Sequence, residues 1–121
     1  MKTEIEKFIF NGFQENTYII HDGDVCVIID PGCSNSDEQN QLVQYIQDKK
    51  LTPKALLLTH AHIDHVLGCS FVQNQYDIPT YLHKDDLSTL NSVVNYAHVY
   101  GFPEYTAPKD PDVLLNGSEK L

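Results

Sequence analysis

Residues 55–65 read ALLLTHAHIDH, and this stretch decides both the fold and the chemistry that we expect. The apolar run 55–58 predicts a short buried β-strand. Side chains that can bind a metal follow directly after it: His60, His62, Asp64 and His65. In α/β proteins, ligand sites lie at the carboxyl ends of strands, where loops present side chains into a crevice. The order of strand and cluster therefore predicts a metal site at one edge of a sheet.

The spacing of the four residues predicts two metal positions. Residues two apart in an extended loop point the same way, so His60 and His62 are expected to bind one metal ion. Asp64 and His65 follow where the chain is expected to turn into a helix, and they are expected to reach a second ion. Two ions about 3.5–4 Å apart can polarise a carbonyl or phosphoryl oxygen together. We predict zinc, with iron or manganese as alternatives, and we assign Asp64 a catalytic role besides ligation.

The segment before the cluster predicts strands followed by a helix. Strands are expected at 4–10, 17–21 and 25–30, separated by turn signals at Asn11-Gly12 and Asp22-Gly23-Asp24. The third strand is apolar almost throughout, which predicts that both of its faces are covered. Ser36 and Gln39 have the spacing of a capping box and predict an amphipathic helix over 37–50.

The segment after the cluster continues the alternation of helix and strand. We expect a short helix over 66–76, a strand over 80–83, one or two helices over 87–100 and a further strand opening at 113. This order predicts an α/β fold with a mixed sheet that begins with antiparallel strands.

Composition and charge limit the classes of function. A chain of 121 residues with 41% hydrophobic residues suits one small domain, 1–121. The formal net charge is −9, with only 8 Lys and Arg, so we expect no nucleic-acid partner. No apolar run approaches the roughly 18 residues of a membrane span, so we expect no membrane partner. The first ten residues lack the apolar core of a signal peptide, and the three cysteines form no CxxC pair, so we expect a cytoplasmic protein.

The run HAHIDH resembles the HxHxDH signature of the metallo-β-lactamase superfamily. Residues 16–18 (NTY) and 27–32 (VIIDPG) are similar to its glyoxalase II-like, or hydroxyacylglutathione hydrolase-like, branch. The resemblance implies an αββα sandwich, with the positions of His60 and His62 on the first metal and those of Asp64 and His65 on the second. It also implies that Asp30 supports the metal loop through hydrogen bonds and that a bridging hydroxide is the nucleophile.

The resemblance covers only the N-terminal half of the family's pattern. The family completes its site with a later histidine, a bridging aspartate and a final histidine, and no matching context occurs before Leu121. We therefore expect a single truncated domain, half of the αββα sandwich, with a half-site. One sheet face would lack its partner layer, which predicts an exposed apolar patch that pairs with a second copy in a homodimer.

Three functions follow as hypotheses. The first is a metal-dependent hydrolase of the glyoxalase II-like type, attacking a small-molecule thioester or ester carbonyl in the intact protein. The second is an iron-dependent oxidoreductase of the persulfide dioxygenase type, which shares the motif. The third is an inactive half-domain that self-associates. The acidic charge disfavours the superfamily's nucleases.

Overall fold

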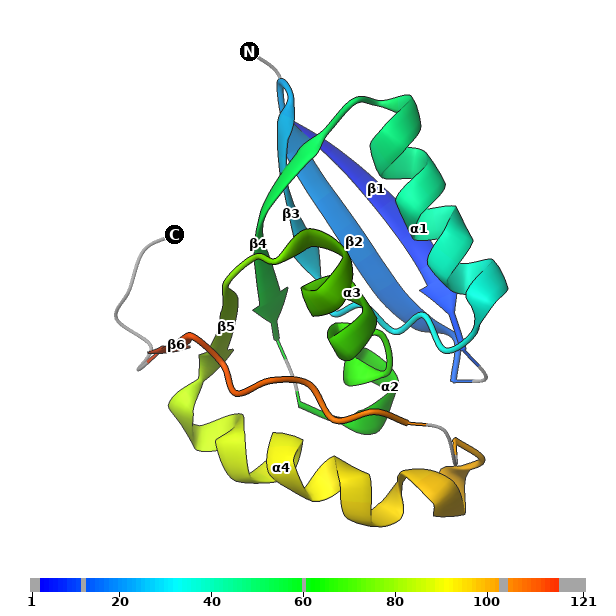
Figure 1. Ribbon diagram of the computed structural model, residues 1–121, viewed down its shortest axis with the longest axis vertical. Coiled ribbons are helices and arrows are strands. Elements are labelled where there is room, and N and C mark those ends of the chain that lie inside the picture. Colours follow the sequence, from blue (N-terminus) through cyan, green and yellow to red (C-terminus); the bar gives the residue numbers. More distant parts are fainter. Residues whose placement is uncertain (1–2, 12, 60, 103–104, 116–121) are drawn as a thin grey trace.

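One mixed sheet of six strands organises the molecule (Figure 1). The computed structural model describes residues 3–11, 13–59, 61–102 and 105–115. The strands lie side by side in chain order, β1-β2-β3-β4-β5-β6. Their bounds are β1 Thr3–Phe10, β2 Glu15–Asp22, β3 Val25–Ile29, β4 Thr52–Leu58, β5 Thr80–His83 and β6 Val113–Leu115.

The sheet changes from antiparallel to parallel at β3. β1 pairs with β2 and β2 with β3 in antiparallel register, whereas β3–β4, β4–β5 and β5–β6 pair in parallel. The predicted mixed sheet with antiparallel N-terminal strands is confirmed. β4 begins three residues before the predicted strand 55–58, and it runs directly into the ligand cluster.

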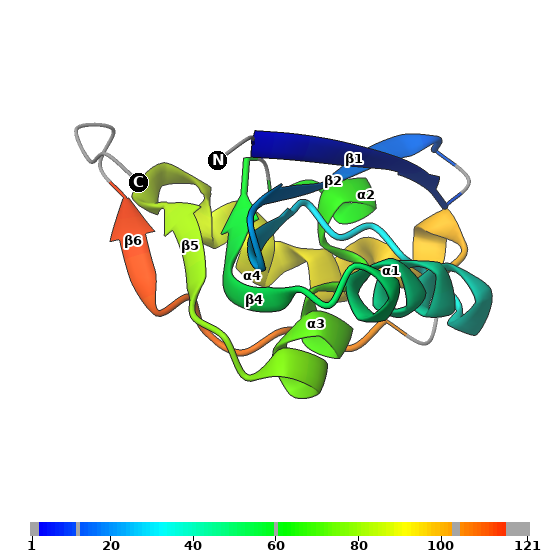
Figure 2. The ribbon, with the colours of Figure 1, turned by 90° about the horizontal axis from the view of Figure 1, so that it is seen from above.

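Helices connect the parallel strands, and α1 and α3 lie on the same side of the sheet (Figure 2). The α-helices are α1 Ser36–Asp48, α2 Ile63–Val66, α3 Cys69–Tyr76 and α4 Leu87–Tyr96, with 3₁₀ turns η1 Lys84–Asp86 and η2 Ala97–Tyr100. The predicted capping box was one residue late, because Asn35 is the N-cap and its Oδ1 accepts from Glu38 N at 2.9 Å. This register frees the Glu38 carboxylate to accept from Ser34 N at 2.7 Å.

The predicted helix 66–76 is wrong in its bounds and its continuity. The chain forms the four-residue α2 first, and α3 begins only at Cys69. The amide of Gly68 donates to Pro31 O at 2.7 Å. This tertiary bond takes the donor that would have continued the first helix, so the chain breaks there.

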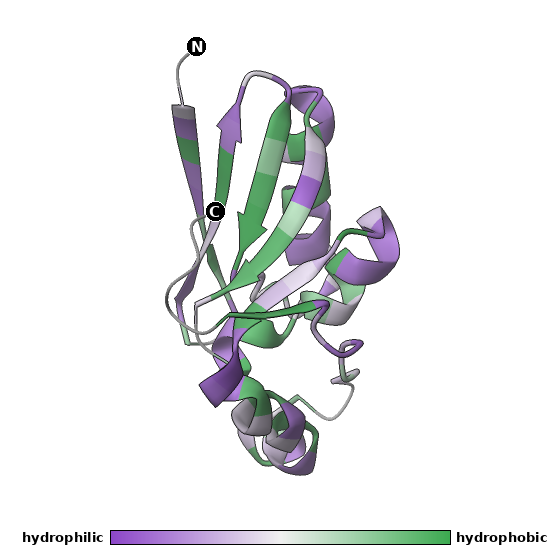
Figure 3. Ribbon diagram, turned by 90° about the vertical axis from the view of Figure 1, so that its left-hand side faces the viewer, coloured by the Kyte–Doolittle hydropathy of each residue, from purple (hydrophilic) through white to green (hydrophobic). Residues whose placement is uncertain are grey.

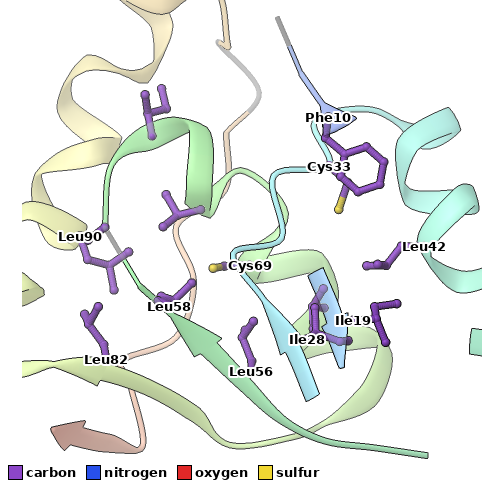
Figure 4. Close-up of a cluster of buried hydrophobic side chains, with 14 of the residues drawn as sticks. Phe10, Ile19, Ile28, Cys33, Leu42, Leu56, Leu58, Cys69, Leu82 and Leu90 are labelled. Carbon is purple, nitrogen blue, oxygen red and sulfur yellow. The ribbon is translucent and has the colours of Figure 1, made fainter. Parts of the chain in front are cut away.

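Helices cover one face of the sheet, and the other face has exposed apolar side chains. On the face under α1 and α3, Ile19, Ile28 and Leu56 are 0% exposed and belong to one core (Figure 4). On the opposite face, Ile5 and Ile9 of β1 are 64% and 60% exposed. Hydrophobic residues run along the central strands (Figure 3). The exposed Ile5 and Ile9 agree with the predicted apolar patch on this face.

The prediction that β3 is covered on both faces is wrong. Cys26 and Ile28 are buried, whereas Val27 and Ile29 are half-buried and Val25 is exposed. The apolar run had suggested two packed layers, but one layer of helices covers only alternate residues of a strand.

No helix among the described residues is both long and apolar enough to cross a membrane.

Candidate metal centre

The carboxyl ends of β3 and β4 bring Asp30 beside the start of the motif loop. The two strands pair in parallel, and Asp30 N donates to Leu57 O at 3.0 Å. The Asp30 carboxylate in turn accepts from Thr59 N at 2.7 Å and from the Thr59 hydroxyl. Asp30 has a positive φ of 52°, an uncommon conformation that is found at functional sites. Asp30 thus holds the residue just ahead of the motif, as the family resemblance implied.

The structure places three of the four predicted ligands. His60 lies outside the described residues, so its expected pairing with His62 stays a prediction. His62 is exposed and is the N-cap residue of α2. Asp64 and His65 lie within α2 and are half-buried, which confirms that the chain turns into a helix at these two positions.

The imidazole of His65 separates two different environments. Its Nδ1 lies 3.1 Å from Asp30 Oδ2 and 3.5 Å from Glu15 Oε1, on the buried side. Its Nε2 lies 3.5 Å from Asp64 Oδ2, on the more open side. Carboxylate, imidazole and carboxylate atoms of Glu15, Asp30 and His65 all lie within 4.8 Å of one another. The site therefore contains two candidate metal positions, one on each side of the His65 ring.

Glu15 is a site residue that the sequence analysis missed. It begins β2, is 4% exposed, and lies on the same strand face as Thr17 and Ile19. Burial raises the pKa of its carboxyl to about 8. Within the described part of the chain, Glu15 Oε1 has no hydrogen-bond partner. Its even spacing from the inward-facing Thr17 was the only signal in the sequence.

The hydroxyl of Thr17 lies between Glu15 and Asp30. Thr17 Oγ1 accepts from Gly32 N at 3.0 Å and lies 2.8 Å from both Asp30 O and Glu15 Oε2. A hydroxyl carries one proton, so it cannot donate to both oxygens at once. If Glu15 is protonated, it donates to Thr17 Oγ1, and Thr17 donates to Asp30 O. Each contact then has one proton, in agreement with the raised pKa.

These contacts favour the open side of His65 for a metal ion. On the buried side, the Asp30 carboxylate already accepts from Thr59 N, and burial raises the pKa of the Glu15 carboxyl, which disfavours the deprotonated form that metal ligation needs. On the open side, the 3.5 Å between His65 Nε2 and Asp64 Oδ2 suits two ligands on one ion. Bonds of 2.0–2.2 Å at a tetrahedral angle place ligand atoms about 3.4 Å apart. The chemistry of these donors fits the predicted metal.

Gly32 permits the close packing of this site. A Cβ there would overlap Glu15 Oε2 and would lie 2.5 Å from Asp64 O. The main chain after β3 can therefore approach both β2 and the motif loop only without a side chain at this position.

A cavity of about 620 Å³ joins the site to the less covered face of the sheet. Ile20 and Ile29 line its apolar part, while Thr59, Asp64 and His65 line its polar end. A small ligand with an apolar body and one polar group would fit this distribution.

Comparison with known proteins identifies the fold and the family. The family model described as "Metallo-beta-lactamase superfamily" matches residues 10–117. The chain is 39% identical over 109 residues to "Probable metallo-hydrolase YqgX" of Bacillus subtilis, covering 89% of this chain and 49% of that protein. It is 31% identical over 105 residues to "Hydroxyacylglutathione hydrolase GloC" of Haemophilus influenzae, covering 85% of this chain and 48% of that protein.

A solved structure, "TTHA1623 in a di-iron-bound form", superposes with a TM-score of 0.82 at 34% identity, covering 96% of this chain and 56% of that chain. The chain thus spans about half the length of the curated relatives it matches. The sheet order, the motif at the end of β4 and these matches agree: the chain belongs to the metallo-beta-lactamase superfamily.

Proposed function

We propose that this chain supplies part of the metal site of a glyoxalase II-like hydrolase that cleaves a small-molecule thioester or ester. The observation that carries the proposal is the 3.5 Å approach of His65 Nε2 and Asp64 Oδ2 at the polar end of the cavity. The likeness to a hydroxyacylglutathione hydrolase supports the thioester class. The chain spans about half the length of these relatives, so we propose the activity for a protein that contains the whole metal site.

In this proposal the residues of the chain bind the metal ions and orient the ligand side chains. His60 and His62 bind the first ion, and Asp64 and His65 bind the second. Bound divalent ions supply Lewis acidity and lower the pKa of water. Asp30 and Glu15 face Nδ1 of His65 and orient the ring so that Nε2 points toward Asp64, the role of outer partners in many metal sites.

Zinc is the ion that we propose first, since its usual ligands are imidazole and carboxylate. Iron and manganese are alternatives with the same ligand types, and a di-iron form is named for the relative TTHA1623. Iron together with turnover of a persulfide would favour the dioxygenase hypothesis instead. We propose a cytoplasmic setting, which the three free and buried cysteines support.

Metal content per chain, measured by elemental mass spectrometry, tests the proposal. We expect bound metal in the wild type and its loss in His62→Ala and in Asp64→Ala. The matched control is His98→Ala, an exposed histidine on η2, which should retain the metal. Loss in the control as well would indicate adventitious binding. A wild type without metal under zinc, iron and manganese loading would show that His60, His62, Asp64 and His65 do not bind an ion without further ligands.

A further inference from the structure

We propose that Asn11 is a positioning residue for the second pair of motif ligands, and this inference rests on the proposed metal site. Asn11 lies in the turn between β1 and β2, far from the motif in sequence. Its Nδ2 donates to Asp64 O at 3.0 Å and to Gly32 O at 3.0 Å. Both amide protons are used, one on each carbonyl. The side chain thus links the motif helix to the loop that follows β3.

The carbonyl of Asp64 depends on this external donor. In a longer helix it would accept from the amide of Gly68, four residues on. That amide donates to Pro31 O at 2.7 Å instead. A helix of four residues has no stability of its own, so the position of α2 is set by such tertiary bonds. Asn11 and Pro31 hold its two ends.

Asn11 is itself held firmly in place. Its backbone amide donates to Glu38 Oε2 at 2.6 Å, and its Oδ1 accepts from Phe13 N at 2.8 Å. Glu38 is fixed in turn by Ser34 N at 2.7 Å and Ser34 Oγ at 2.9 Å. A continuous chain of hydrogen bonds therefore runs from the first turn of α1 through Asn11 to Asp64, and it fixes the main chain from which the Asp64 carboxylate projects.

A turn residue with no further role is the alternative reading of Asn11. Asn11 has a φ of 55°, a conformation that asparagine tolerates and glycine prefers. Two substitutions separate these readings. Asn11→Gly keeps the turn and removes the amide. Asn11→Asp keeps the Oδ1 acceptor and replaces the donor with an oxygen facing two carbonyl oxygens. The control is Gln14→Gly, because Gln14 has the same φ in the same turn and an exposed side chain.

Amide hydrogen exchange on the full chain without metal gives the first readout. We expect exchange at His65 and Gly68 to rise about tenfold in Asn11→Gly and in Asn11→Asp, the effect of losing two hydrogen bonds. Exchange at Leu56, in the core of β4, should not change, and Gln14→Gly should match the wild type. Wild-type exchange in Asn11→Gly would overturn the proposal. An equal rise at Leu56 would also overturn it, since the effect would then be global.

Cobalt(II) titration of the same variants, followed by absorption spectroscopy, gives the second readout. We expect the affinity to fall about tenfold in both Asn11 variants and to stay unchanged in Gln14→Gly. Equal affinity in Asn11→Gly and the wild type would overturn the proposal. A wild type that binds no cobalt would count against the proposed metal site alone, because the exchange measurement on the metal-free chain still decides the role of Asn11.

Discussion

The two faces of the sheet are built from the same kinds of residue but have different environments. Under α1 and α3, Ile28 and Leu56 are fully buried, whereas Ile5 and Ile9 on the other face are mostly exposed. An exposed face this rich in isoleucine resembles an interface, because soluble proteins rarely leave such patches open. Apolar residues on both faces of a strand indicate that both faces need to be covered. Among the described residues, helices cover only one of the two faces.

Neighbouring leucines on β4 give the largest contrast between the faces. Leu56 is buried in the core, and Leu57 is half-buried on the other face. We expect Leu56→Ala to lower the free energy of unfolding by about 2–5 kcal/mol, because it leaves a cavity in a packed core. Leu57→Ala should cost less than half as much, since water fills the space. Urea denaturation of both variants measures the difference, and equal losses would show that a second layer already covers Leu57.

This contrast marks the limit of what the sequence could predict. The apolar residues of 17–21 and 25–30 and the turn signal between these segments located β2 and β3, because these signals are local. Whether an apolar face is covered depends on elements distant in sequence, so β3 was wrongly expected to be buried on both sides. The break before Gly68 was missed for the same reason, since its bond to Pro31 is tertiary.

The candidate site also contains residues that a local signal identified and residues that only tertiary contacts bring to it. The motif identified Asp64 and His65 because their types and spacing are chemical signals within one short segment. Glu15 and Asn11 contact that segment from the β1–β2 hairpin, and Asn11 lies 53 residues away from Asp64 in the chain. An Asn-Gly pair predicts a turn whether or not the asparagine side chain makes other contacts. The sequence pattern therefore could not predict the bonds from Asn11 to two carbonyl oxygens.

The buried Glu15 carboxyl is expected to make the free energy of unfolding depend on pH, an effect smaller than that of Leu56→Ala. Burial raises the pKa of the Glu15 carboxyl to about 8, from 4.5 in the unfolded chain. The folded chain keeps a proton that the unfolded chain loses, so stability should fall as pH rises from about 4.5 to 8. The slope for one proton is at most about 1.4 kcal/mol per pH unit. Below pH 4.5 this contribution is fully present.

Urea denaturation of the metal-free chain at several pH values, with chelator present, measures this slope. Glu15→Gln keeps the size of the side chain and cannot ionise, so its stability should decline less between pH 5 and 8 than that of the wild type. The amide also retains a donor for Thr17 Oγ1, and we expect it to fold normally. Identical slopes in the two proteins would contradict a protonated Glu15 in the folded state.

The exposed face gives the smallest expected effect on stability and tests whether a second copy covers it. Self-association of the chain stays a prediction, and sedimentation velocity measures it. Ile9→Lys should shift the chain toward monomer while changing the free energy of unfolding by less than about 0.5 kcal/mol. The control is Val99→Lys, which alters an apolar side chain that is 72% exposed on η2, away from the sheet.

The pair of lysine variants separates burial from charge. The chain carries a formal net charge of −9, which opposes association of two copies. Each substitution adds one positive charge, so a purely electrostatic effect would strengthen association equally in both. Burial of the sheet face predicts the opposite for Ile9→Lys alone, because a lysine in an apolar interface must lose its hydration. A wild type that is monomeric at high concentration would show that a second copy does not cover this face, and would leave it to a different partner layer.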